Sequence, residues 1–202
     1  MKRFLTVISI MLYLSAAAYS QSLTQADRDR AMKYLESTKQ GVLAATAGLS
    51  EAQWNFKPGP DRWPVAEVTE HIAAAEDYLM GLITDKVMAA PPRPAGEDVK
   101  AIDEVVLTAI PDRSHKAQAP EPLKPTNRFG SPHGSLKHFT ESRGRTEDFL
   151  RTHDDLRAHA MDSPLEKKLD AYQWVLFIAA HSERHTKQIA EVKADPKFPK
   201  NN

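Results

Sequence analysis

Two histidines four residues apart, His181 and His185, lie in a stretch from Ala171 to Lys193 that contains neither Pro nor Gly. The stretch is predicted to be one helix, because apolar residues recur in it at helical spacing: Trp174, Phe177, Ile178, Ile189 and Val192. Residues four apart differ by about 40° around a helix axis. Both imidazoles therefore face whatever this helix packs against, and a divalent metal ion is the partner that uses two ring nitrogens at once.

A third histidine, His71, lies on the apolar face of another predicted helix, which Pro64 opens at the position where proline is best tolerated. Converging buried imidazoles need a metal ion or a polar network, because an unpaired buried polar group is costly. Periodicity alone leaves two interpretations open. His71, His181 and His185 either share one metal ion or form separate hydrogen bonds in the core.

Other polar residues near these histidines have weaker patterns. Glu183 projects at roughly 200° from His181, so it cannot act as the base of an H-E-x-x-H protease and is expected to pair with Lys187 instead. No convincing general base is evident, and Glu76 and Asp77, five and six residues after His71, are the carboxylates considered for that role. Arg184 is expected to form a structural ion pair, with a substrate carboxylate as the alternative.

The remaining histidines carry no site prediction. We expect His159 to cap carbonyl groups at a helix end, and the others to be solvated: His115, His133, His138 and His153.

The composition excludes several classes of function. Lys plus Arg equals Asp plus Glu, at 27 each, and no basic run is interleaved with aromatics, so no nucleic-acid partner is expected. The chain has no cysteine, which excludes disulfides, thiolate metal sites and a Cys nucleophile. Any metal ion must be held by His, Asp or Glu.

Residues 1–20 have the pattern of a signal peptide. Lys2 and Arg3 precede an apolar run from Phe4 to Leu14, and small residues follow before Gln21. The run is shorter than the roughly 20 residues that a membrane-spanning helix needs, so cleavage is favoured over an anchor. We expect an exported protein, periplasmic or secreted, with no stable membrane anchor after cleavage.

Residues 21–195 are predicted to form one all-α domain, and 196–202 a disordered tail. Helical patterns cover 24–49, 64–83, 134–159 and 171–193, and no strand is predicted. The irregular connection 89–131 is too long for a helical hairpin and suits a crossover between helices that run the same way. In the first connector, Trp54, Phe56 and Trp63 are expected to pin the loop to the bundle, with one tryptophan lining a pocket as the alternative.

The segments Trp63-Pro-Val-Ala-Glu-Val-Thr-Glu-His71 and His181-Ser-Glu-Arg-His185 resemble the motifs of the DinB-like (DinB/YfiT) superfamily. The likeness extends over about 24–193 and is weakest in 89–131. It implies a four-helix bundle with up-down-down-up connectivity, often a homodimer, and a divalent metal ion held by three histidines. By position these are His71, His181 and His185. Pro64 departs from the family, which often has a serine there.

Three neutral imidazoles suit zinc or nickel, with iron or manganese as further candidates, and leave an open position for water. Two enzyme functions follow: a hydrolase that activates water, and a transferase that binds the thiolate of a small thiol. Some DinB-like relatives are similar to thiol-dependent transferases. The substrate is a small molecule of unknown identity. The alternative is a non-catalytic, exported metal-binding or stress-associated bundle, whose closed site would need a fourth protein ligand.

Overall fold

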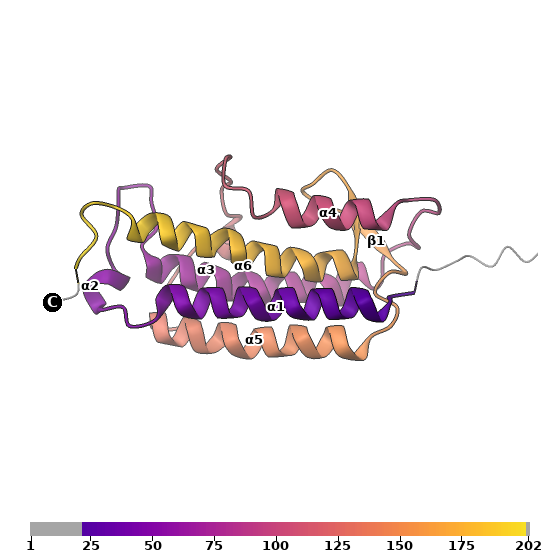
Figure 1. Cartoon of the computed structure of the whole chain (residues 1–202), viewed down its shortest axis with the longest axis horizontal. Helices are drawn as coiled ribbons and strands as arrows, with labels where there is room; N and C mark the ends of the chain where they lie inside the picture. Colours follow the sequence, from indigo (N-terminus) through magenta and orange to yellow (C-terminus); the bar gives the residue numbers. More distant parts are fainter. Residues whose placement is uncertain (1–21, 201–202) are drawn as a thin grey trace, which may run out of the picture.

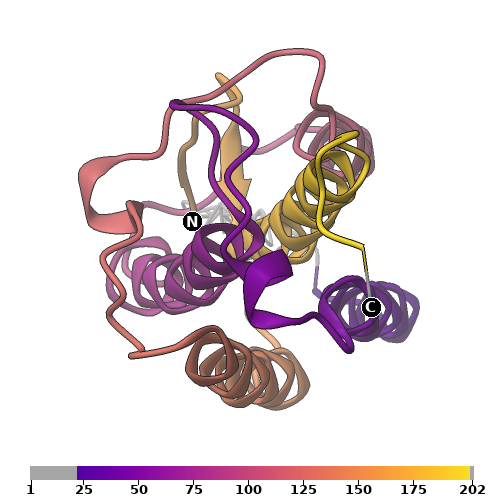
Figure 2. The same ribbon diagram turned by 90° about the vertical axis from the view of Figure 1, so that its left-hand side faces the viewer.

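A computed structural model describes residues 22–200, and the predicted signal peptide at 1–20 lies outside the described residues. Four long helices form the body of the protein: α1 (Gln25–Thr46), α3 (Val65–Leu82), α5 (Pro132–Thr152) and α6 (Ala171–Lys193). In Figure 1, α1 and α6 run in one direction and α3 and α5 in the other. The end-on view in Figure 2 shows the four helices around a common core. The predicted up-down-down-up four-helix bundle is therefore confirmed.

Local capping explains where these helices begin. The Thr24 hydroxyl accepts from the backbone N–H of Asp27, whose carboxylate accepts from the N–H of Thr24, so the two residues form a capping box. Asp170 and Gln173 form the same reciprocal arrangement at the start of α6. This second box fixes the register of the helix that carries His181 and His185.

The crossover between α3 and α5 contains three short elements. A π-helical turn, η1 (Ile83–Val87), continues α3; a helix, α4 (Val99–Ala109), and a 3-10 turn, η2 (Glu121–Leu123), follow it. In both ribbon views α4 lies outside the bundle, alongside α6. The crossover therefore passes over α6 before it reaches α5.

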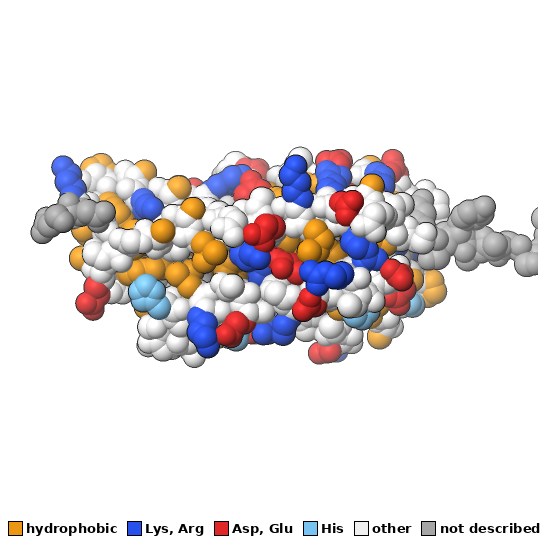
Figure 3. Space-filling model, turned by 60° about the horizontal axis from the view of Figure 1, so that its bottom comes forward, with side chains coloured by type: hydrophobic (Ala, Val, Ile, Leu, Met, Phe, Trp, Pro, Cys, Tyr) orange, Lys and Arg blue, Asp and Glu red, His pale blue; other side chains and the backbone are white. Residues whose placement is uncertain are grey.

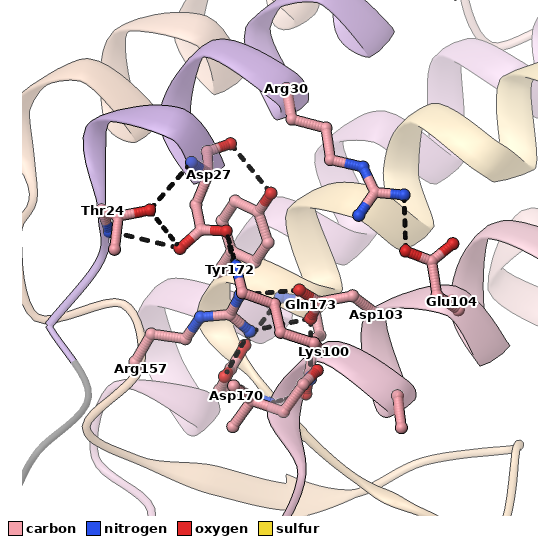
Figure 4. Close-up of polar contacts among 12 residues, drawn as sticks. Thr24, Asp27, Arg30, Lys100, Asp103, Glu104, Arg157, Asp170, Tyr172 and Gln173 are labelled. Carbon is pink, nitrogen blue, oxygen red and sulfur yellow. Dashed lines mark hydrogen bonds and ion pairs between the residues drawn. The ribbon is translucent and has the colours of Figure 1, made fainter.

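A buried polar cluster holds α4 in place (Figure 4). The guanidinium group of Arg157 donates two hydrogen bonds to Asp103 of α4, at 2.8 and 2.7 Å, and one to Asp170, at 3.0 Å. Gln173 donates to the carboxylate of Asp103 and to the carbonyl of Val99. These bonds join the middle of the crossover to the first turn of α6.

Three regions differ from the sequence-based expectation. The third long helix ends at Thr152 rather than at residue 159, and Leu156 is buried in the connection that follows. Two three-residue strands, β1 (Ala160–Asp162) and β2 (Lys168–Asp170), pair antiparallel with Met161 opposite Leu169. Strands this short carry too few residues for a period-two pattern, so none was predicted.

The sequence predicts disorder from residue 196, but the carboxyl-terminal segment contacts the bundle through Phe198 and Pro199. The rings of Phe198 and Phe56 meet edge to face at 5.5 Å, and Gln53 donates to the carbonyl of Pro199. These contacts cover the connector between α2 (Glu51–Trp54) and α3.

The surface carries both signs of charge. On the face formed by α1 and α5, Lys and Arg side chains alternate with Asp and Glu, and neither sign gathers in one region (Figure 3). Within residues 22–200, no helix combines the length and the apolar character needed to cross a bilayer.

Candidate metal centre

The three predicted histidines converge between α3 and α6. The Nε2 atom of His71 lies 3.2 Å from Nε2 of His181 and 3.2 Å from Nε2 of His185, and the latter two atoms are 3.1 Å apart. His71 and His185 are buried, at 3 % and 8 % exposure, whereas His181 is partly exposed. The three nitrogens therefore form a nearly equilateral triangle.

This triangle matches the spacing of ligands around one ion. Tetrahedral zinc sites have Zn–N bonds of about 2.0–2.1 Å, which separates two ligand nitrogens by about 3.3–3.4 Å. The observed separations of 3.1–3.2 Å are close to that value. Within residues 22–200, the only group of His, Asp or Glu side chains with such convergent ligand atoms is this one. The cluster thus suits a divalent metal ion.

Hydrogen bonds at the opposite ring nitrogens fix the tautomers of two of the imidazoles. Nδ1 of His71 lies 2.8 Å from the carbonyl oxygen of Leu123, which can only accept, so Nδ1 carries the proton. Nδ1 of His185 lies 2.7 Å from Oε1 of Gln188 and donates to it. In the neutral rings both Nε2 atoms then present lone pairs to each other. Two such lone pairs at 3.2 Å require a cation or a shared proton between them.

The electrostatic setting keeps the three rings neutral. Burial lowers the pKa of the His71 imidazole below its usual value. Burial, reinforced by the neighbouring imidazoles, lowers the pKa of His181 and of His185 well below the usual value. Neutral imidazole is the form that binds a metal ion.

Trp63 lines the histidine cluster. Its ring lies 5.0 Å from that of His71 and is half-buried. Trp54 is buried at 3 % exposure, and Phe56 packs on Phe198. Trp54 and Phe56 therefore pin the connector to the bundle, as expected, and Trp63 packs beside His71. Trp174 is buried in the core, as predicted.

The two candidate bases are engaged away from the triad. The Glu76 carboxylate accepts two hydrogen bonds from Arg143, at 2.7 and 2.9 Å, and one from Thr146 at 2.9 Å. Asp77 accepts from Ser142 and binds His138 at 2.5 Å. Neither carboxylate is placed to act as the general base suggested from the sequence.

The structure also shows the contacts of Glu183, Arg184 and His159, for which the sequence predicts partners. Glu183 pairs with Lys187 at 2.7 Å, as expected, and also accepts from the hydroxyl group of Tyr34. Among the described residues Arg184 makes no carboxylate ion pair, and it instead donates to backbone carbonyls of the crossover, at Ile110, Asp112 and His115. His159 lies 2.6 Å from the carbonyl oxygen of Ala90 and takes no part in the triad.

Sequence inspection missed the residues that orient the histidines. Gln188 follows His185 by three positions, so its side chain lies on the same helical face, a signal that was available. Leu123 acts through its backbone, and Arg113 reaches Gln188 from the crossover at 3.4 Å. No sequence pattern marks these two residues, because their positions depend on the path of the crossover.

The fold is an up-down-down-up helical bundle, and its three inward-facing histidines form a candidate metal site. These two features define the class of protein. The chain belongs to the DinB superfamily, whose family model matches residues 34–189. It is similar to the uncharacterized protein YuaE of Bacillus subtilis (strain 168), with 27 % identity over 147 residues that cover 72 % of this chain and 86 % of YuaE.

A solved structure shows the same fold. YfiT from Bacillus subtilis, described as a probable metal-dependent hydrolase with an unusual four-helix bundle topology, aligns with a TM-score of 0.52. The identity is 20 %, and the alignment covers 86 % of this chain and 89 % of YfiT. At this identity the likeness establishes the fold alone.

Proposed function

We propose that the protein is a metal-dependent hydrolase that holds one divalent ion, zinc or nickel, through Nε2 of His71, His181 and His185. The observation that carries the proposal is the triangle of three Nε2 atoms, 3.1–3.2 Å apart. In His71 and His185 the other ring nitrogen, Nδ1, donates its proton to an oxygen, which leaves Nε2 free to bind a metal ion. The description of YfiT as a probable metal-dependent hydrolase supports the same class. Zinc and nickel are proposed first because imidazole suits both ions and because the affinity of nitrogen sites for divalent metals is lowest for manganese and iron in this series.

The ligand set favours catalysis over a structural site. Three protein nitrogens leave one position of a four-coordinate ion for water or substrate. A divalent ion held there would acidify water and polarise a substrate oxygen. The chain's own contribution is to hold three neutral imidazoles and to place the Trp63 ring beside His71.

Elemental analysis tests the metal site directly. We expect about one equivalent of a divalent metal in the purified protein and a large loss in His185→Ala. Equal metal content in the two proteins would overturn the assignment.

Two further measurements separate the functional classes. Hydrolysis of ester, amide and phosphoester reporter substrates by the metal-loaded protein, abolished by chelation, would support the hydrolase. The second candidate, a thiol-dependent transferase, is favoured only by the affinity of such an ion for thiolate; it predicts a sulfur-to-cobalt charge-transfer band when a small thiol is added to the cobalt-substituted protein. Tight metal binding with neither response would indicate the non-catalytic alternative.

Export to the periplasm or beyond, with a cleaved signal at residues 1–20, is part of the proposal and rests on the amino-terminal sequence pattern alone. Homodimer formation stays a prediction. Sequencing of the mature amino terminus and the sedimentation mass of the purified protein test these two points.

A further inference from the structure

The crossover contributes an arginine, Arg113, that is linked to the histidine cluster through another side chain. Arg113 lies just beyond α4, where its Nε and Nη2 donate to the two carboxylate oxygens of Glu191 at 2.6 and 2.8 Å. Its remaining nitrogen, Nη1, points to Oε1 of Gln188 at 3.4 Å, a long hydrogen bond from a charged donor. The two bonds to Glu191 hold the guanidinium plane, so this third contact is a fixed one.

The same oxygen of Gln188 accepts from Nδ1 of His185 at 2.7 Å. A carboxamide can rotate and present either its oxygen or its NH₂ group to a neighbour. With Arg113 beside it, only the orientation that turns the oxygen toward both donors is favourable. If the amide flipped, its NH₂ group would face the guanidinium group and the imidazole together.

The amide orientation decides where His185 carries its proton. An oxygen at Nδ1 holds the proton there and leaves the Nε2 lone pair directed at His71 and His181. An NH₂ group at Nδ1 favours the other tautomer, in which a proton occupies the nitrogen that faces the cluster. That proton would have to leave before a metal ion could bind.

We infer that Arg113 is a positioning residue of the proposed metal centre, acting through Gln188 to keep Nε2 of His185 unprotonated and available to a metal ion. This inference rests on the proposed function for its metal readout but not for its tautomer readout. Arg113 touches no ligand itself. Removal of residues that orient a metal-bound histidine typically weakens metal affinity about 10- to 100-fold.

The sign of the effect separates positioning from simple charge. A guanidinium group near a divalent cation repels it, so an electrostatic role predicts tighter metal binding when Arg113 is replaced. The positioning role predicts weaker binding. Arg184 supplies a matched control, because it also binds the crossover and carries the same charge, but within residues 22–200 it donates only to backbone carbonyls.

The experiment compares wild type, Arg113→Met, Arg113→Met/Gln188→Glu, Arg184→Met and Arg184→Met/Gln188→Glu. Nitrogen-15 NMR of the imidazoles in the metal-free proteins reports the His185 tautomer, and cobalt titration reports the dissociation constant. We expect Nδ1–H in wild type and in Arg184→Met, a shift toward Nε2–H in Arg113→Met, and a cobalt dissociation constant about tenfold or more higher in Arg113→Met alone. Glutamate at position 188 can only accept, so it should restore the tautomer and raise affinity more in the Arg113 background than in the Arg184 background.

An unchanged tautomer or a lower dissociation constant in Arg113→Met, or an equal loss in Arg184→Met, would overturn the inference. Failure of the wild type to bind cobalt would overturn the proposed function, while the tautomer comparison would still decide the role of Arg113. Arg113→Lys covers misfolding of the methionine variant: it keeps the charge but loses the fork to Glu191, and it should show the same tautomer shift.

Discussion

The carbonyl oxygen of Leu123 lies 2.8 Å from Nδ1 of His71. Glu70, which precedes His71 on α3, binds the backbone of the residues that follow Leu123. The Glu70 carboxylate accepts the backbone N–H groups of Thr126, Asn127 and Arg128 at 2.7–3.1 Å. Neighbouring residues of one helix therefore hold the end of the crossover and one imidazole of the candidate metal centre. The crossover is part of the site as well as a connection.

Replacement of Glu70 by Ala should loosen residues 123–128 and, with them, the acceptor of His71. We expect faster amide hydrogen exchange in this segment and weaker cobalt binding, because His71 loses the carbonyl that fixes its tautomer. Glu67→Ala is the control, since Glu67 lies one turn earlier on α3 and makes none of these backbone bonds. Equal exchange in the two variants would contradict the proposed anchoring.

The metal-free protein should lose stability as the pH falls below about 6.5. The pKa values of His71, His181 and His185 lie below that of an exposed histidine. The unfolded chain therefore binds more protons than the folded one once the pH drops below the unfolded value of about 6.5, and the free energy of unfolding decreases. Urea unfolding with chelator at pH 7.5, 6.5 and 5.5 measures this slope.

A triple His→Gln variant at these positions serves as the reference for the pH experiment. Its free energy of unfolding should change less over the same interval. If wild type and variant show parallel pH dependence, the three imidazoles are not the groups responsible.

Glu76→Gln should destabilise the protein strongly without abolishing metal binding. It would leave the Arg143 guanidinium group, which is 0 % exposed, without its anionic partner. Breaking a buried ion pair from one side typically costs about 3–5 kcal/mol. The double variant Glu76→Leu/Arg143→Met should recover part of that loss. Urea unfolding gives the energies. An equally large loss of cobalt affinity in Glu76→Gln and in the double variant, which both lack the carboxylate, would instead implicate Glu76 in the site.

Asp103→Asn should release α4 from the bundle. Asp103 is fully buried and binds Arg157 through both oxygens (Figure 4), so the variant weakens the attachment of α4 to α6. We expect faster hydrogen exchange in Val99–Ala109 and a large drop in stability. The adjacent Glu104→Gln is a matched control, because the Glu104–Arg30 pair is exposed and such pairs contribute only about 0–1 kcal/mol.

The histidine triad and the bundle could be predicted because both depend on periodicity. His181 and His185 share one face of a helix with Ile178, and His71 shares one with Val68 and Ile72, so burial of those faces brings the rings together. The length of the crossover indicated that α3 and α5 run in the same direction. Each of these inferences uses only residues close in sequence, together with the length of one connection.

The features that escaped prediction depend on contacts between distant segments. Phe198 orders the carboxyl-terminal segment because Phe56 is beside it. The third long helix stops at Thr152, where His153 takes an extended conformation as the C-cap, although no Gly or Pro marks the site. The partners of Glu76 and Gln188, which are Arg143 and Arg113, come from other elements and could not be assigned from local spacing.

The half-buried indole of Trp63, 5.0 Å from the ring of His71, makes the site self-reporting. Its emission should be quenched when an open-shell ion such as cobalt or copper occupies the neighbouring nitrogens, and should change little with closed-shell zinc. Trp174 belongs to the other core cluster and supplies a background signal, whereas Trp54 packs in the same cluster as Trp63. Occupancy can therefore be followed optically in the unlabelled protein.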